Sequence, residues 1–344
     1  MTNNKLDKTT KNNKQKNFVN LKRTGSSSAL AKYKRSHISD GLSSQDKFLR
    51  KLYGTKAGRM LLKVLIRPEI SICSGWLMDR PVSKIAIRPF IKKNNIDMSK
   101  CVKNIDEFES YNDFFKRKIT ADARITDDTE FGFVSPCDGR LTVYNIYDTA
   151  SAKFNIKDSQ YSLEQLLRDK KLAQRYKGGR LWLFRLCVDD YHRYIYNVDG
   201  IQSEVRRIDG VYHTVNPIAS EYYKIYKENT REYCLIKTRD AGTIVFMEVG
   251  ALLVGKIENH FVRRHRVMKG QEKGNFAFGG STIILLTQKN AVEPFGRILE
   301  NSARHVETKV IQGELVGYIN KKESSQYNLS LIHISEPTRL DVIS

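Results

Sequence analysis

Long apolar runs are absent from this sequence of 344 residues, and cysteine is scarce. No stretch approaches the roughly 18 to 20 apolar residues that a membrane-spanning helix needs, and the first residues lack the apolar centre of a secretory signal. We therefore expect any membrane association to be peripheral, at the cytoplasmic face. The five cysteines are odd in number and form no Cys-x-x-Cys pair, so we expect neither a disulfide framework nor a metal site.

Acidic residues are too few to balance the basic ones. Lys and Arg number 59 against 38 Asp and Glu, a formal net charge of +21. Twelve of the basic residues and only three Asp fall within residues 1–50. Such a segment attracts phosphate polyanions, at about 1 kcal/mol per basic residue near an anionic membrane, although a solvated, disordered tail explains it equally well. It carries no recognisable nucleic-acid motif, so we expect no nucleic acid as a partner.

The composition and the hydrophobic pattern of the chain predict four parts. Residues 1–45 read as a flexible basic extension, and residues 46–125 as a helical, membrane-proximal part. Residues 126–322 read as a strand-rich catalytic core, and residues 323–344 as a non-native tail. The hydrophobic content of 40% is enough for a proper core. The predicted fold class is α+β, with a helical N-terminal part.

Local patterns place the elements within these parts. Met60, Leu61, Val64 and Leu65 fall on one face of a basic helix, which either lies in a membrane interface or packs against the core. One further helix is predicted over 162–175. Short β-type runs bounded by Gly, Asp and Asn predict strands at 140–147, 180–188, 194–198, 233–237, 243–249 and 281–287.

The motif with the most chemical content is Gly-Gly-Ser-Thr at residues 279–282, directly before an apolar strand. For self-cleavage, the hydroxyl of Ser281 must approach the carbonyl carbon of Gly280 at about 3 Å, in a turn that glycine permits. The peptide would become an ester, and β-elimination and hydrolysis would leave a pyruvoyl group at residue 281. The products would be fragments 1–280 and 281–344. An isolated motif of this kind is more often a simple turn.

Other segments reverse these odds. Residues 135–139 read Ser-Pro-Cys-Asp-Gly and residues 190–194 read Asp-Tyr-His-Arg-Tyr. With Gly-Gly-Ser-Thr, they resemble the phosphatidylserine decarboxylase proenzyme family. Weaker matches in the family's order lie at 111–118, 215–219, 246–251 and 269–274. The resemblance runs from about Leu52 to Gly317.

The resemblance implies that Ser281 becomes a pyruvoyl cofactor, which decarboxylates phosphatidylserine to phosphatidylethanolamine and carbon dioxide. No metal or external cofactor is then required. Asp138 would orient a base, and His192, expected to titrate near neutrality, would protonate the substrate. Expected partners are phosphatidylserine, an anionic membrane surface and the two fragments as a heterodimer, with a homo-oligomer also possible.

An apolar lining is expected around the reacting serine, since a carboxylate leaves more easily from a dry site. Phe276, Phe278 and Ile283 could form it, although core packing explains them equally well.

One position departs from the family. Family members commonly carry a second histidine three residues after the first, and here Ile195 stands in its place. Three repairs are open: His192 serves both steps, His213 replaces the missing imidazole, or processing is lost and the protein is a lipid-binding relic. The intact cleavage motif favours His213 or His192 as the base.

That relic, an uncleaved protein that binds anionic lipid, is one alternative to the expected function. The other is a self-cleaving pyruvoyl decarboxylase of a soluble amino acid. His260 and His265 lie among three arginines and read as an exposed basic loop, either solvated or facing lipid headgroups.

Overall fold

The computed structural model describes residues 51–147, 153–156, 159–213, 225–250, 256–277 and 281–320. These residues form a helical part first and mostly strands from residue 132 onward, which confirms the α+β class and the strand-rich core. The expected extension 1–45 and the expected tail 323–344 lie outside the described residues. The domain boundaries therefore stay predictions.

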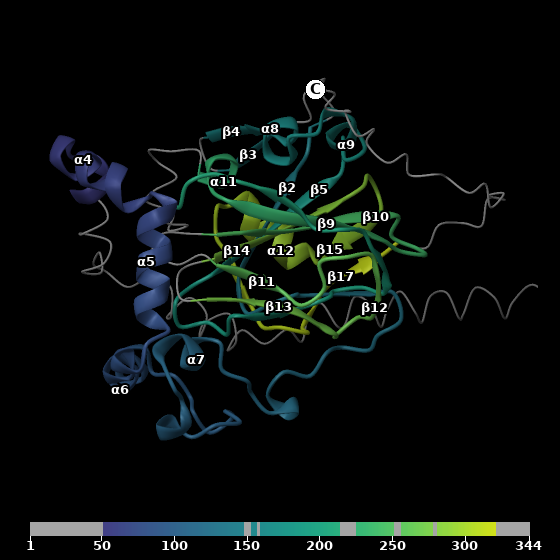
Figure 1. Ribbon diagram of the computed structural model, residues 1–344. Coiled ribbons are helices and arrows are strands. Elements are labelled where there is room, and N and C mark those ends of the chain that lie inside the picture. Colours follow the sequence, from purple (N-terminus) through teal and green to yellow (C-terminus); the bar gives the residue numbers. More distant parts are fainter. Residues whose placement is uncertain are drawn as a thin grey trace, which may run out of the picture.

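The largest sheet contains nine strands and is antiparallel throughout (Figure 1). Its order is β12-β7-β9-β10-β14-β5-β2-β16, and β8 pairs with β9. The strands are β2 (Gly139–Asn145), β5 (Arg180–Leu186), β7 (Gly200–Gln202), β8 (Arg206–Ile208), β9 (Arg231–Lys237), β10 (Thr243–Val249), β12 (His265–Val267), β14 (Ser281–Thr287) and β16 (Thr308–Val310).

The central strand β14 is buried along its whole length, which explains its unbroken apolar run. Ile284 and Leu286 enter one hydrophobic core, and Ile283 and Leu285 enter the other, because successive side chains point to opposite faces. Each such side chain contributes about 1.5–3 kcal/mol on burial. The two cores fix the position of β14, and with it that of its first residue, Ser281.

Smaller sheets and short helices cover the large sheet. One small sheet has the order β1-β17-β15, another β11-β13-β6, and β3 pairs with β4. These strands are β1 (Gly132–Val134), β3 (Lys153–Ile156), β4 (Ser159–Ser162), β6 (Arg193–Ile195), β11 (Ile257–Asn259), β13 (Glu272–Phe276), β15 (Val292–Pro294) and β17 (Leu315–Ile319). The helices among the strands are α8 (Leu163–Leu167), α9 (Lys170–Gln174), α11 (Ile225–Glu228) and α12 (Gly296–Ala303).

The N-terminal helices stand at one side of the sheets (Figure 1). Helix α4 (Lys56–Leu65) begins after Thr55, whose Oγ1 accepts a hydrogen bond from the Gly58 amide at 3.0 Å. The remaining elements are α5 (Pro68–Met78), η1 (Pro81–Ala86), α6 (Ile87–Asn94), η2 (Ile105–Glu107), α7 (Tyr111–Phe115) and η3 (Ala121–Ala123). None of the helices in the described ranges has the length and apolarity to cross a bilayer.

Two predicted elements differ in the structure. The helix predicted over 162–175 is broken into α8 and α9, because Arg168 is left-handed (φ 49°) and Asp169 caps a new helix by accepting from the Leu172 amide at 2.8 Å. The strand predicted over 194–198 already ends at Ile195.

Candidate active site

Ser281 opens β14, pairs with Leu186 of β5 and is fully buried. Its Oγ has no hydrogen-bond partner among the described residues, and the same holds for Thr282 Oγ1. A buried hydroxyl without a partner costs about 1–3 kcal/mol, so it calls for an explanation. Gly280, the expected target of Ser281, lies outside the described residues.

The sheet topology gathers several chain segments at the edge where β14 begins. Because β14 is antiparallel to β5 and β10, and β5 is antiparallel to β2, the starts of β14 and β2 lie beside the ends of β5 and β10. Asp138 directly precedes β2, and Asp190 and His192 follow β5. The His192 carbonyl accepts from the Phe276 amide at 3.0 Å, at the end of the strand that leads to the cleavage motif.

Asp138 is buried and held by an arginine. Its Oδ1 accepts from Arg124 Nε at 2.8 Å and from the Gln312 amide at 2.9 Å, and its Oδ2 pairs with Arg124 Nη2 at 2.5 Å. This fork fixes the direction of the carboxylate. Its side-chain partner is thus Arg124, so the orientation of a base histidine by Asp138 stays a prediction.

His192 is fully buried, with one ring nitrogen held and the other free among the described residues. Nδ1 lies 2.9 Å from the Asp190 carbonyl oxygen, which can only accept, so Nδ1 carries the proton and Nε2 keeps its lone pair. The ring of Phe115 covers the imidazole at a centroid distance of 4.2 Å. Burial lowers the pKa of His192 to about 4, so the expected titration near neutrality is replaced by a neutral base.

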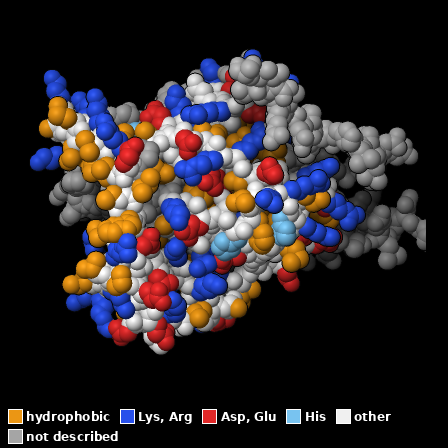
Figure 2. Space-filling model, viewed as in Figure 1, with side chains coloured by type: hydrophobic (Ala, Val, Ile, Leu, Met, Phe, Trp, Pro, Cys, Tyr) orange, Lys and Arg blue, Asp and Glu red, His pale blue; other side chains and the backbone are white. Residues whose placement is uncertain are grey.

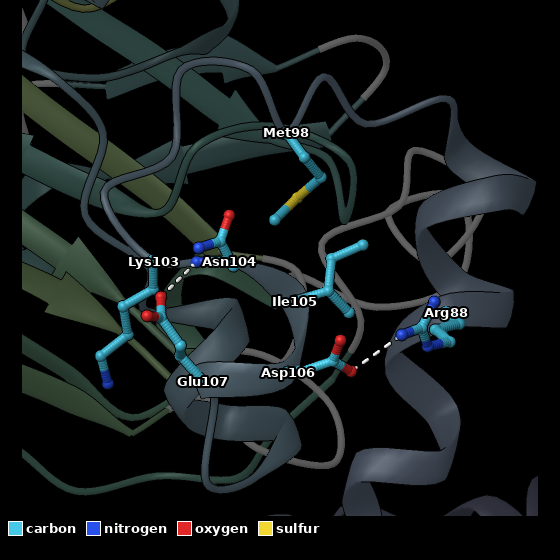
Figure 3. A pocket seen from close by; sticks show the side chains of 7 residues that line it. All are labelled: Arg88, Met98, Lys103, Asn104, Ile105, Asp106 and Glu107. Atoms are coloured by element: carbon cyan, nitrogen blue, oxygen red, sulfur yellow. Dashed lines mark hydrogen bonds and ion pairs between the residues drawn. The ribbon is translucent and has the colours of Figure 1, made fainter.

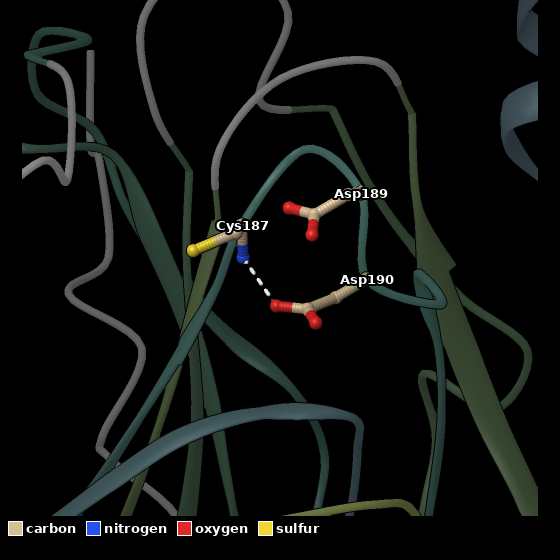
Figure 4. Close-up of side chains that lie close together, drawn as sticks. All are labelled: Cys187, Asp189 and Asp190. Atoms are coloured by element: carbon tan, nitrogen blue, oxygen red, sulfur yellow. Dashed lines mark hydrogen bonds between the residues drawn. The ribbon is translucent and has the colours of Figure 1, made fainter. Parts of the chain in front are cut away.

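Asp190 lies beside His192 and was not assigned a role from the sequence. Its Oδ2 accepts from the Cys187 amide at 2.7 Å (Figure 4), and Arg140 lies 3.7 Å away. Burial raises the pKa of Asp190 to about 6.

Ligand atoms of Cys187, Asp189 and Asp190 lie within 4.8 Å of one another. However, Arg140 and Arg185 already contact the Cys187 sulfur at 2.6 and 3.1 Å, and these positive charges disfavour a metal cation there.

His213 is also buried. Its Nδ1 lies 3.4 Å from the Tyr53 hydroxyl, and its Nε2 lies 3.5 Å from Glu228 Oε2. Burial lowers the pKa of His213 to about 4. The site therefore contains a second neutral imidazole, which has a carboxylate beside it.

Asn229 ties His213 to the strand next to Ser281. The Asn229 side chain accepts from the His213 amide at 2.9 Å, and its Nδ2 donates to the carbonyls of His213 and Gly250, each at 2.7 Å. Gly250 directly follows β10, whose last residue pairs with Thr282. The structure thus brings the backbone of His213 to the same sheet edge as Ser281.

Ile195, the position that lacks the family's second histidine, is a buried residue of β6. Its amide donates to the Pro136 carbonyl at 2.9 Å, beside the segment that contains Asp138. Phe276 and Ile283 of the expected apolar lining are both fully buried members of one core, whereas Phe278 lies outside the described residues.

Removing the His192 imidazole should flatten the pH dependence of stability. Burial puts its folded pKa at about 4, below the 6.5 of an ordinary histidine, so the unfolded chain binds more protons between these values. This contribution to the free energy of unfolding is present above pH 6.5 and is lost as the pH falls toward 4. In a Ser281→Ala background, we expect the difference between His192 and His192→Gln chains, from urea titrations, to rise by about 2 kcal/mol from pH 5 to 7. A constant or falling difference would contradict the assignment.

One hollow in the described surface lies away from this chemistry. It has a volume of about 620 Å³ and is open to solvent between α6 and η2 (Figure 3). Arg88 and Asp106 form an ion pair of 2.8 Å across it. It is lined by Arg88, Met98, Lys103, Asn104, Ile105, Asp106 and Glu107, so no predicted site residue contributes to it.

An apolar surface runs along the N-terminal helices, at the left of the space-filling view (Figure 2). On α4 the side chain of Met60 is 74% exposed, and on α5 those of Ile72 and Trp76 are 71% and 56% exposed. Basic side chains accompany them. We call this the helical face; its exposed apolar residues are Met60, Leu61, Val64, Ile72, Trp76, Leu77, Val82 and Ile85.

Comparison with known proteins places the chain in a family. Residues 111–318 match the family model for phosphatidylserine decarboxylase. Phosphatidylserine decarboxylase proenzyme 2 of Clostridium acetobutylicum is 44% identical over 79% of this chain and 92% of its own length. The proenzymes of Ruminiclostridium cellulolyticum and Desulfitobacterium hafniense are 41% and 37% identical, over 79% and 80% of this chain and 91% and 93% of theirs. The chain therefore belongs to the phosphatidylserine decarboxylase family.

Proposed function

We propose that this chain is a proenzyme that cleaves itself between Gly280 and Ser281 and then converts phosphatidylserine to phosphatidylethanolamine and carbon dioxide. The observation that carries this proposal is the buried Ser281 Oγ, without a partner among the described residues, at the start of the central strand. The names of the relatives, which are proenzymes of phosphatidylserine decarboxylase, support the substrate and the processing.

Self-cleavage needs a nucleophile, a base and a small residue before the nucleophile. Ser281 Oγ would attack the Gly280 carbonyl carbon, and the peptide bond would be replaced by an ester. Loss of the Cα proton of residue 281 would eliminate the Gly280 carboxylate and leave dehydroalanine. Addition of water and release of ammonia would then give a pyruvoyl group. The atoms balance with one water consumed, and no external oxidant is needed.

His213 is the better base for that first attack. The carboxylate of Glu228 near its Nε2 would stabilise the imidazolium, as the aspartate does in a Ser-His-Asp arrangement. Nδ1, which lies 3.4 Å from the Tyr53 hydroxyl, would take the proton directly or through that hydroxyl. Asn229 holds the His213 backbone at the end of β10, next to the strand that Ser281 begins. His213 would thus replace the imidazole that is missing at Ile195.

The residues around Ser281 suit a pyruvoyl group. The Oγ atom of Ser281, which would leave as an oxygen of the Gly280 carboxylate, is buried. Thr282 Oγ1 and His192 Nε2 are buried polar atoms without a hydrogen-bond partner among the described residues, so either could bond to the new group. A pyruvoyl ketone would bind the substrate amine and act as the electron sink when the carboxylate leaves. The burial of Phe276 and Ile283 would help to exclude water.

His192 would carry the proton of the second reaction. The amine of phosphatidylserine is protonated in water and must lose a proton to react, and the free Nε2 lone pair of His192 would accept it. Because burial lowers the pKa of His192 to about 4, the imidazolium would be a strong acid. It would return the proton to the substrate Cα after carbon dioxide leaves. His192 would thus be neutral in the resting enzyme and would become protonated only when it accepts the proton of the substrate amine.

The two fragments would stay together as a heterodimer. The strand β14 begins at the cut and lies between β5 and β10, bonded to both. Its buried side chains belong to both cores of the large sheet, so the smaller fragment could leave only if those cores opened.

The helical face would hold the enzyme on an anionic membrane as a peripheral protein of the cytoplasmic leaflet. Its apolar side chains would enter the interface, while Lys56, Arg59 and Lys63 of α4 would meet the lipid phosphates. This placement would keep the enzyme on the surface where its substrate lies.

Replacing Ile72 and Trp76 by serine should weaken binding to vesicles that contain anionic lipid by at least tenfold. Each apolar side chain contributes roughly 1.5–3 kcal/mol to binding when it enters the interface, and its replacement by serine removes this contribution. Vesicle sedimentation measures the effect. The matched control is Val262→Ser, which replaces an exposed apolar residue outside the helical face. Equal binding of all three proteins would refute the docking role of the helical face.

Carbon dioxide release tests the proposed reaction directly. The purified protein should release it from vesicles that contain phosphatidylserine and not from free serine at the same concentration. Release from free serine alone would show a soluble amino acid as substrate, and release from neither would remove the proposed activity.

A further inference from the structure

Arg117 is a buried cation with an incomplete set of bonds. It is 6% exposed, and its Nε has no hydrogen-bond partner among the described residues. Its guanidinium lies over the Phe114 ring at 5.1 Å and bonds to the Cys101 thiol. No carboxylate of the described ranges lies within ion-pair distance of it. Burial lowers the pKa of Arg117, which reflects the cost of holding this charge away from water.

Arg231 shows what a buried arginine looks like when its role is structural. It is fully buried too, and burial lowers its pKa to about 10. Its guanidinium, however, donates to four backbone carbonyls at 2.7–3.0 Å, those of Gln165, Leu166, Lys227 and Asn229. The protein therefore holds one buried guanidinium with four bonds to its own backbone, whereas the Nε–H of the other has no partner among the described residues.

Arg117 belongs to the segment that covers the active site. Two residues earlier, Phe115 packs on the His192 ring at 4.2 Å. Arg193, directly after His192, donates from its Nε to the carbonyls of Lys116 and Arg117 at 2.8 and 3.3 Å. These contacts hold the backbone of Arg117 next to the His192 segment, and the charge of Arg117 contributes, after burial, to the low pKa of His192.

We infer that Arg117 binds the phosphodiester of the substrate headgroup, an inference that rests on the proposed function. A guanidinium fork matches the two free oxygens of a phosphodiester. Phosphatidylserine also carries a carboxylate, but its charge disappears as carbon dioxide leaves. A cation bound to the carboxylate would stabilise the ground state more than the transition state and slow the reaction. The phosphodiester keeps its charge from substrate to product and is the group that a fixed cation can hold throughout.

This assignment predicts a defect in binding rather than in chemistry. With short-chain phosphatidylserine in mixed micelles, Arg117→Met should raise KM at least tenfold and leave kcat within threefold of the wild type. Arg117→Lys keeps the charge but not the fork and should give an intermediate KM. Arg206→Met, which removes an exposed arginine of β8, is the control for net charge and should behave as the wild type.

A second measurement uses binding without catalysis. Glycerophosphoethanolamine carries the amine and the phosphodiester but no carboxylate, and ethanolamine lacks the phosphodiester. By calorimetry, glycerophosphoethanolamine should bind the wild type at least tenfold more tightly than Arg117→Met. The weaker binding of ethanolamine should be the same for both proteins.

The outcomes separate this inference from the proposed function. Unchanged glycerophosphoethanolamine binding in both Arg117 variants, or a lowered kcat with unchanged KM, would overturn the role of Arg117 while the decarboxylase stands. If Arg117→Met and Arg117→Lys both stay uncleaved, Arg117 serves folding or processing and the inference is wrong. A wild type that binds glycerophosphoethanolamine through Arg117 yet releases no carbon dioxide would refute the decarboxylation and support the phosphodiester site.

Discussion

Ser281→Ala should yield a single chain of 39.7 kDa that releases no carbon dioxide from phosphatidylserine. Alanine has no hydroxyl to attack the Gly280 carbonyl, so neither the cut nor the pyruvoyl group can form. The fold should be retained, because the lost Oγ makes no hydrogen bond with the described residues and the strand is held by its apolar neighbours. Denaturing gel electrophoresis and a carbon dioxide assay measure the two effects.

A matched control separates the effect of removing the nucleophile from the effect of replacing a serine elsewhere in the chain. Ser203→Ala, directly after β7, removes a hydroxyl that donates to the Glu204 carbonyl at 2.9 Å and accepts from the Leu235 amide at 3.0 Å. We expect normal cleavage and activity. Ser281→Cys retains a nucleophile and should be cleaved, more slowly than the wild type. Cleavage of Ser281→Ala at the same position would refute Ser281 as the nucleophile.

The two buried histidines should separate processing from decarboxylation. His213→Ala should slow self-cleavage about 10²- to 10⁴-fold, the usual contribution of a positioned base. His192→Ala should be cleaved but should lose a similar factor in kcat, because its Nε2 would carry the proton from the substrate amine to Cα. Time courses on denaturing gels report the first effect, and carbon dioxide release by fully cleaved protein reports the second.

Further variants decide between the two histidines. Glu228→Gln should slow cleavage less than His213→Ala, since it removes only the charge beside the imidazole. His265→Ala, in an exposed part of β12, is the control and should change neither rate. Normal cleavage of His213→Ala together with an uncleaved His192→Ala would transfer the base role to His192.

Local sequence patterns predicted an element well where its side chains are buried along its whole length. The strand over 281–287 was predicted with its observed bounds, because apolar residues buried on both faces leave an unbroken run between turn signals. The helix over 162–175 was wrong in its middle, where the left-handed Arg168 breaks it. No local apolar pattern distinguishes a continuous helix from two short helices that pack on the same core.

The candidate site was predictable only in the identity of its residues. Ser281, His192 and Asp138 follow from motifs, but the partner of Asp138 is Arg124, which belongs to no motif that the sequence singled out. Asn229 and Glu228 lie next to His213 through tertiary contacts alone. Arg117 stands between two lysines in the sequence and resembles a solvated residue. Arg117 differs from these two lysines because it is buried, and burial also lowers the pKa of His192. Burial is a property of the fold, which the local sequence does not show.

The most direct test of the account is the intact mass of the purified protein under denaturing conditions. We predict two fragments, residues 1–280 and residues 281–344, the smaller one without an N-terminal amine and with the mass of a pyruvoyl group at position 281. A single uncut chain, a cut at another bond, or a small fragment that begins with an unmodified serine would contradict the account.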